Sequence, residues 1–218
     1  MTKQTRHRSI RIAHDVKFIA DTHFCHPMMV SVREQPDGST VQLRKFGTMN
    51  EHDYALVDAW NEAVRPKETV FHLGDFGFWK APVEDLQRIF KRLHGRKFLL
   101  PGNHDSFEVE SFGWEGVLRG PVRWTADDGA NIVGTHHPLR EWDGWHHGAL
   151  HFHGHTHNSL PSSRRSMDVG IDSIGMWPLN ATDLRAYMSQ LPELDFKGVE
   201  VDPFEADIVE DEDAEMRP

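Results

Sequence analysis

Residues 100–105 read Leu-Pro-Gly-Asn-His-Asp and end a short run that starts at Lys97 and is mostly apolar. Such a run predicts a buried strand, and the Pro-Gly pair turns the backbone at its end. An amide, an imidazole and a carboxylate then follow in immediate succession. Polar residues at the carboxyl end of a strand are typical of ligand-binding loops in open α/β sheets. This stretch therefore predicts a functional loop at the edge of a sheet.

Four further clusters repeat this arrangement, each after an apolar run. They are Asp21-Thr22-His23, Gly74-Asp75, Thr135-His136-His137 and Gly154-His155-Thr156-His157. Asp21 and His23 are two residues apart, so an extended backbone would direct both side chains to one side. Five such clusters in one chain predict a shared site rather than five unrelated loops.

Strands and helices are predicted to alternate between residues 16 and 103. Apolar runs predict strands over 16–20, 69–73 and 97–100. The sequence Thr48-Met49-Asn50-Glu51 is a capping-box pattern that opens one helix, and Pro82 suits the start of a second helix. A strand-helix-strand-helix-strand order predicts a parallel sheet with right-handed crossovers.

The rest of the chain divides as follows. Residues 1–14 are expected to be an extension with an edge strand, and 15–195 to be one domain that contains an inserted hairpin at 28–46. Later strands are predicted over 131–135, 149–153, 167–171 and 176–179, and Thr182 is expected to cap a last helix. Residues 196–218 are expected to form a disordered acidic tail, because their composition offers little to bury.

Composition limits the possible classes of protein. The 218 residues carry a net charge of −10, but 199–218 contain nine acids and one base, so this segment accounts for −8 and the rest for −2. A nearly neutral body does not indicate nucleic-acid binding, although a local basic patch would suffice. No apolar run approaches the ~20 residues of a membrane span. A single cysteine, Cys25, and the lack of a signal-peptide pattern favour a cytoplasmic protein without membrane contact.

The five clusters together supply the donors of a two-metal site. Carboxylate, imidazole and amide oxygen suit Mn, Fe, Zn or Ni. The seven candidate ligands are Asp21, His23, Asp75, Asn103, His136, His155 and His157. They are too many for one ion and enough for two that share a carboxylate, and two ions ~3.5–4 Å apart can clamp the oxygens of a phosphoryl displacement. Asp75 is the natural bridge, because it has two oxygens and Gly74 lets the backbone approach closely.

The ordered blocks Asp-x-His, Gly-Asp, Gly-Asn-His-Asp, His and Gly-His-x-His resemble the calcineurin-like metallophosphoesterase superfamily, over about residues 16–180. Asp-Thr-His-Phe-x-His at 21–26 is similar to the first block of a subgroup of small single-domain members. The resemblance implies an α/β (α+β) fold of two mixed β-sheets packed as a sandwich and flanked by helices. The parallel sheet of 16–103 would be one half of it.

The resemblance also implies roles for these residues. One ion would be held by Asp21, His23, Asp75 and His157, and the other by Asp75, Asn103, His136 and His155. His104 would contact the substrate phosphate and act as general acid, with Asp105 orienting it. A hydroxide between the ions would attack in line. Mn is the expected metal, with Fe, Zn or Ni as alternatives.

Two departures from the family pattern stand out. Phe76, Gly77 and Phe78 follow Gly-Asp where many members have a further acid, which argues against an analogy with the cyclic-nucleotide and protein-phosphatase branches. Cys25 stands where glycine is usual in the subgroup, and a small packed side chain is the expected explanation. Beyond the blocks, His72 is expected to be a core histidine. The hairpin at 28–46 either overhangs the site or is a solvated flap, in which case Arg33, Arg44 and Lys45 are surface charge.

The leading functional hypothesis is a phosphoesterase that favours phosphodiesters over phosphoproteins. Its partner would be a small phosphate ester, with a nucleotide or nucleic acid as alternatives. A DNA or RNA nuclease would require a basic groove, and a non-catalytic metal-binding interaction module would be expected to have lost ligands. His26 and Arg140 are candidate substrate-binding residues, because His26 lies just beyond the first block and Arg140 soon after His136.

Overall fold

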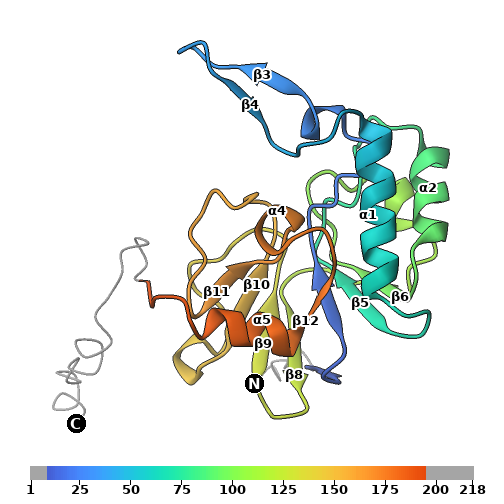
Figure 1. The fold of residues 1–218 in the computed structure, drawn as a ribbon. Coiled ribbons are helices and arrows are strands. Elements are labelled where there is room, and N and C mark those ends of the chain that lie inside the picture. The colour runs from blue at the N-terminus through green and yellow to red at the C-terminus, as the bar shows by residue number, and fades with distance from the viewer. Residues whose placement is uncertain (1–8, 195–218) are drawn as a thin grey trace, which may run out of the picture.

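A computed structural model describes residues 9–194, which form two five-stranded mixed sheets (Figure 1). The first sheet has the order β12 (Leu179–Asn180), β2 (Lys17–Ile19), β5 (Thr69–His72), β6 (Arg96–Leu99), β7 (Gly116–Val117). The second has the order β1 (Ile10–Ile12), β8 (Val122–Ala126), β9 (Asn131–Gly134), β10 (Leu150–His153), β11 (Ser166–Asp168).

The alternation predicted for residues 16–103 is confirmed. Strands β2, β5 and β6 are parallel neighbours, connected through α1 (Met49–Ala63) and α2 (Val83–Arg92). Thr48 forms the predicted capping box with Glu51, which satisfies free backbone N–H groups at the start of α1. Both helices lie on the same side of the first sheet in Figure 1.

The two sheets pack face to face as a sandwich. Phe18 and Phe71 of the first sheet meet Trp124 of the second sheet, and Phe18 also meets Phe152, with ring centroids 4.9–5.2 Å apart in edge-on or near-perpendicular geometry. Edge-to-face packing is a favoured arrangement for buried aromatic rings. On the other side of the first sheet, α1 and α2 bury a second core that includes Trp60. Apolar side chains on both faces explain why β2 and β5 lie in continuous apolar runs.

The last helix, α5 (Ala181–Met188), begins earlier than the sequence suggests. Asn180 is its N-cap, since the Asn180 side chain accepts a hydrogen bond from the backbone N–H of Asp183. The prediction that Thr182 caps this helix is therefore wrong. The chain also forms the short helices α3 (Phe107–Glu110) and α4 (Ile171–Ile174), and the 3₁₀ turns η1 (Pro27–Met29) and η2 (Trp145–His147).

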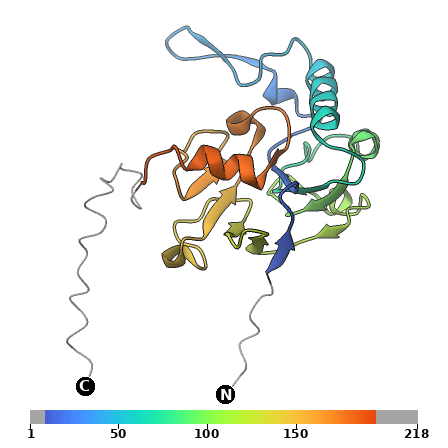
Figure 2. The same cartoon turned by 60° about the horizontal axis from the view of Figure 1, so that its bottom comes forward.

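A two-stranded hairpin projects away from both sheets, as Figures 1 and 2 show. It consists of β3 (Val32–Glu34) and β4 (Thr40–Gln42), in which all three residues of β3 are exposed. The hairpin therefore contributes little to the core. Its return segment behaves differently, because Arg44 is only 6% exposed.

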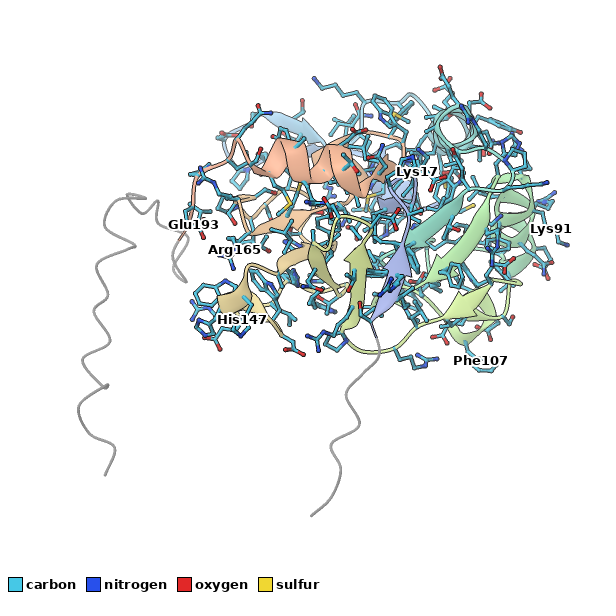
Figure 3. All side chains as sticks on the ribbon, turned by 90° about the horizontal axis from the view of Figure 1, so that it is seen from below. Lys17, Lys91, Phe107, His147, Arg165 and Glu193 are labelled. Carbon is cyan, nitrogen blue, oxygen red and sulfur yellow. The ribbon has the colours of Figure 1, made fainter. Side chains whose placement is uncertain are left out.

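At each end of the described chain, the terminal strand lies in a different sheet from the strand next to it in sequence. β1 pairs with β8 in the second sheet, whereas β12 pairs with β2 in the first. Near the surface, Arg165 and Glu193 lie close together while His147 and Phe107 are at the periphery (Figure 3). The predicted acidic tail lies outside the described residues. Among the helices of residues 9–194, none has the length and apolar character needed to cross a membrane.

Candidate metal centre

Loops from both sheets meet where β2, β5, β6, β9 and β10 end. Backbone hydrogen bonds continue past β2 and β5, from Asp21 N to Gly74 O and from His23 N to Asp75 O, each 3.0 Å long. The two sheets are joined here as well, because Asp21 Oδ2 accepts a hydrogen bond from the backbone N–H of His155. All seven side chains expected to bind metal come together at this junction.

The first group of ligands surrounds His23. Its Nε2 lies 3.2 Å from Nε2 of His157, 3.6 Å from Oδ2 of Asp75 and 4.0 Å from Oδ1 of Asp21. Two imidazole nitrogens and two carboxylate oxygens thus face one small volume. This is the quartet implied for one ion.

The second group surrounds Asn103. Its Oδ1 lies 3.0 Å from Nε2 of His136 and 3.0 Å from Nδ1 of His155. His136 Nε2 is also 3.4 Å from Oδ2 of Asp75. Asp75 therefore faces both groups, in the position expected of a bridging carboxylate.

The backbone in these loops is held in a conformation that favours glycine. Five of the seven candidate ligands have positive φ angles between 47° and 70°, namely Asp21, His23, Asp75, His155 and His157. Non-glycine residues adopt this left-handed region at a cost of about 1–2 kcal/mol each, and such strain clusters at functional sites. Cys25 also has a positive φ, of 60°, which explains why glycine suits this position.

Gly102 lets two of the loops approach each other. A Cβ atom at this residue would lie 2.2 Å from Oδ1 of Asp75 and 2.8 Å from Cε1 of His136. Any larger residue would displace the central carboxylate. The Pro-Gly turn of the opening stretch is thus a steric requirement of the cluster.

The electrostatics of the cluster indicate a site for cations. Burial raises the pKa of Asp21 to about 7, and its Oδ1 atom has no hydrogen-bond partner. Burial also lowers the pKa of His23 well below its usual range, which keeps the imidazole neutral and able to bind metal. Burial opposes ionisation of Asp75 too, but the hydrogen bond from His136 and the nearby imidazoles hold its pKa below the ordinary value.

His104 lies beside the first group without belonging to it. Its ring centroid is 4.9 Å from that of His23, in a perpendicular orientation, and its backbone N–H donates to Oδ1 of Asp75. Its Nδ1 atom is buried without a hydrogen-bond partner. The ring is therefore positioned beside the ions' expected location but is not held by a neighbouring acceptor.

Asp105 has different partners from those expected. Its carboxylate accepts hydrogen bonds from the backbone N–H groups of Asp75, Phe76 and Gly102, at 2.8–2.9 Å. None of these contacts reaches the His104 side chain. Asp105 therefore ties the loop after β6 to the loop after β5, and burial raises its pKa to about 6.

The two candidate substrate-binding residues have different locations. His26 is only 7% exposed, and its ring centroid lies 4.2 Å from that of Phe78 and 5.6 Å from that of His104. Arg140 is exposed, and no described contact connects it with the cluster. Elsewhere, His72 is the expected core histidine, bonded to Thr22 Oγ1. Burial raises the pKa of Cys25 to about 12, which agrees with a packed thiol rather than a ligand.

Sequence reasoning missed two residues behind the first group. Asp172 Oδ2 lies 2.7 Å from Nδ1 of His157, and the buried guanidinium of Arg44 forms a two-pronged ion pair with Asp172. Of the two interpretations of the hairpin, the one that makes Arg44 surface charge is wrong for this residue, which is buried. Asp172 directly follows the predicted strand 167–171, so the signal of an acid after an apolar run was present. Burial alone would raise the pKa of Asp172, but hydrogen bonds from His157 and Arg44 hold it below its usual range.

The residues present fit divalent metal ions. Four overlapping groups of carboxylates and imidazoles place their donor atoms within 4.8 Å of one another, among them Asp21 with His23 and His157, and Asp21 with Asp75 and His136. Buried polar atoms without partners are rare in folded proteins, and Asp21 Oδ1, an atom of the first ligand group, is one of them. A cation between the carboxylates would compensate the charge that burial otherwise disfavours.

The chain is similar in sequence to known proteins. The family model of the calcineurin-like phosphoesterases matches residues 14–128, which is more than half of the chain. An uncharacterized protein of Methanocaldococcus jannaschii is 26% identical over 174 residues, covering 76% of this chain and 86% of its own length. The gene 66 protein of Mycobacterium phage L5 is 27% identical over 190 residues, covering 72% of this chain and 86% of its own.

A solved structure supports the fold. The crystal structure of a protein of unknown function from Aquifex aeolicus superposes with a TM-score of 0.56 at 19% identity, covering 81% of this chain and 100% of that chain. At this identity the similarity supports the architecture alone. The overall architecture is thus similar to that of a known structure.

Proposed function

Because the chain belongs to the calcineurin-like phosphoesterase family, we propose that it hydrolyses phosphate esters with two divalent metal ions and prefers phosphodiesters. The observation that carries this proposal is the convergence of seven metal-ligating side chains from two sheets. A non-catalytic module would have no need to keep all seven together with His104. We propose Mn as the working metal, since the mixed oxygen and nitrogen donors suit it.

The preference for diesters rests on charge. A phosphate monoester carries up to one more negative charge than a diester, and arginine or lysine side chains commonly bind such groups. Within residues 9–194, Arg44 is the one arginine or lysine bonded to the loop of Asp21 and Thr22, and its guanidinium is occupied by Asp172 and backbone carbonyls. The guanidinium bonded to this loop is therefore not free to bind a dianion.

The side chains would divide the work as follows. When bound, the ions would lower the pKa of water and offset the charge that develops on the phosphate. Asp75 faces both ligand groups and would bind both ions. Asp105 fixes the backbone of Asp75 by accepting a hydrogen bond from its N–H. His104, beside the first group, would protonate the leaving oxygen. His26 lies next to His104 and would contact the substrate there.

The proposal is tested with bis-p-nitrophenyl phosphate and p-nitrophenyl phosphate in the presence of Mn, Fe, Zn or Ni. We expect turnover that is faster with the diester and is abolished in Asp75→Asn. Asp58→Asn, an exposed change on α1, is the matched control and should leave turnover unchanged. Absence of turnover with all four metals would contradict the proposal. Single-stranded DNA in the same panel tests whether the substrate is a nucleic acid.

We expect His104→Gln to lower kcat by about 10²–10⁴-fold, the usual contribution of a general acid. Binding of Mn²⁺ should persist, because His104 is outside both ligand groups. The loss should be greater for a diester with an alkyl alcohol as leaving group than for p-nitrophenol, which departs without a proton. His147→Gln, at the periphery in Figure 3, serves as the control. An equal loss for both leaving groups would argue against proton donation by His104.

A further inference from the structure

The structure behind the first ligand group leads to a further inference, which rests on the proposed metal centre. We propose that Arg44 and Asp172 are positioning residues that fix His157 and the Asp21 loop for the ion of the first group alone. Neither residue faces the ligand volume directly. Both act through the groups that they hold, so they are not catalytic residues.

The guanidinium of Arg44 uses all five of its N–H donors. Nε and Nη2 bind the two oxygens of Asp172 at 3.0 and 2.8 Å. Nη2 also donates to Asp21 O at 2.6 Å, and Nη1 donates to Thr22 O at 2.8 Å and lies 3.0 Å from His52 Nε2. A lysine has at most three donors from a single point, so it could not reproduce this set.

These contacts hold backbone that is strained. Asp21 and His23 have φ angles of 56° and 47°. In the same loop, Arg44 donates hydrogen bonds to the carbonyl oxygens of Asp21 and Thr22. A strained conformation persists only where its surroundings enforce it. The guanidinium therefore fixes the direction in which the Asp21 and His23 side chains leave the loop.

Asp172 fixes the imidazole of His157. With Nδ1 of His157 donating to Asp172 Oδ2 over 2.7 Å, the lone pair is on Nε2, which faces His23 and the first group. A carboxylate behind a metal-binding histidine sets its tautomer and orientation and raises its basicity. His157 thus has a charged acceptor behind it.

The second group is built differently. His136 has the backbone carbonyl of Leu73 behind its Nδ1, at 2.8 Å, rather than a carboxylate. His155 directs its Nδ1 to Asn103 and is exposed. Loss of the Arg44–Asp172 pair should therefore weaken one of the two ions and leave the other unchanged.

The pair also connects the inserted hairpin to the metal centre. Arg44 follows β4, and its backbone N–H donates to Met29 O, which closes the base of the hairpin. From Arg44 the buried contacts continue through His52 to Asp53, which accepts a hydrogen bond from the backbone N–H of Cys25. The base of the hairpin is thus part of the support of the first ligand group, although its strands are exposed.

The experiment is calorimetric titration of metal-free full-length protein with Mn²⁺, in the unmodified chain and in Arg44→Lys and Asp172→Asn. We expect two Mn²⁺ to bind the unmodified chain, and each variant to weaken one ion by about 10- to 100-fold, the usual effect of losing such a supporting contact. At two equivalents of Mn²⁺ per chain, the electron paramagnetic resonance signal should change from that of a coupled pair in the unmodified chain to that of isolated ions in the variants.

Arg33→Lys is the matched control, since Arg33 is an exposed arginine of the same hairpin. If Arg44→Lys does not fold, the nearly isosteric Asp172→Asn decides. Unchanged affinities, equal weakening of both ions, or fewer than two Mn²⁺ on the unmodified chain would each overturn the inference. Since no substrate is present, a failure of the proposed function appears separately, as absent turnover in the panel.

Discussion

His151 on β10 shows how single residues set the response of this fold to acid. It is completely buried, Nδ1 has no partner, and burial lowers the pKa of its imidazole to about 3. In the unfolded chain a histidine has a pKa of about 6.5, so below that pH the unfolded state binds a proton that the folded state excludes. The stability that the neutral ring contributes is therefore complete above pH ~6.5 and is lost as the pH falls toward 3.

We expect His151→Leu to make the metal-free protein less sensitive to acid. One proton taken up only by the unfolded state costs about 1.4 kcal/mol of stability for each pH unit below 6.5. Between pH 7 and pH 5, the free energy of unfolding should therefore fall by about 2 kcal/mol less in the variant than in the unmodified chain. Urea unfolding in the presence of a chelator measures the difference. His147→Leu, at an exposed position, should behave like the unmodified chain. Parallel pH profiles for His151→Leu and the unmodified chain would refute this.

At the residue scale, the sequence was sufficient to predict the ligand types but not the residues that support them. Asp21, Asp75 and the histidines follow apolar runs, which a sequence displays directly. Arg44 and Asp172 are 128 positions apart, so no local pattern in the sequence indicates that they pair. The partners of Asp105 were also beyond prediction, because backbone N–H groups leave no compositional signal.

At the element scale, periodicity predicted the helices and the parallel strands well, since each buries a regular apolar face. Its failures occurred at short or irregular pieces. Asn180 rather than Thr182 caps α5. Both residue types are good N-caps, so the sequence alone does not choose between them. The hairpin was recognisable from its turn, but nothing in its pattern separated the exposed strands from the buried Arg44.

The hairpin provides a prediction at this scale. Val32 pairs with Gln42, so residues 33–41 can be replaced by Asn-Gly, a pair that closes two-residue hairpins. We expect Mn²⁺ affinity and melting temperature to stay close to those of the unmodified chain, because the segment removed is almost entirely exposed and Arg44 remains. Loss of Mn²⁺ binding in this shortened chain, measured by calorimetry, would show that the exposed strands also support the site.

At the scale of the whole molecule, the candidate ligands come from both sheets. Asp21, His23, Asp75 and Asn103 follow strands of the first sheet, and His136, His155 and His157 follow strands of the second. The sequence predicted the parallel half directly, whereas the second sheet was anticipated from the family resemblance. Its strands are separated by irregular loops, such as residues 154–165 between β10 and β11, whose path no local pattern determines.

Metal removal should therefore destabilise the whole fold. A ligand present at 100 times its Kd adds about 2.7 kcal/mol, and 1 kcal/mol shifts the melting temperature of a chain of this size by about 2–4 °C. We expect Mn²⁺ to raise the melting temperature of chelator-treated protein by at least about 5 °C, and to raise that of Asp75→Asn far less. Scanning calorimetry measures the melting temperatures of both proteins. Identical melting with and without Mn²⁺ would contradict the prediction that bound ions join the two sheets.

The pairing of β12, the last described strand, with β2 has a consequence during protein synthesis. A ribosome releases β2, β5 and β6 first, with four of the ligands, but the edge partner β12 and the imidazoles after β9 and β10 emerge much later. Pairings between segments so distant in sequence form slowly. We therefore expect a nascent polypeptide to lack a complete set of candidate ligands until His157 has left the exit tunnel, so that metal capture follows the synthesis of most of the domain.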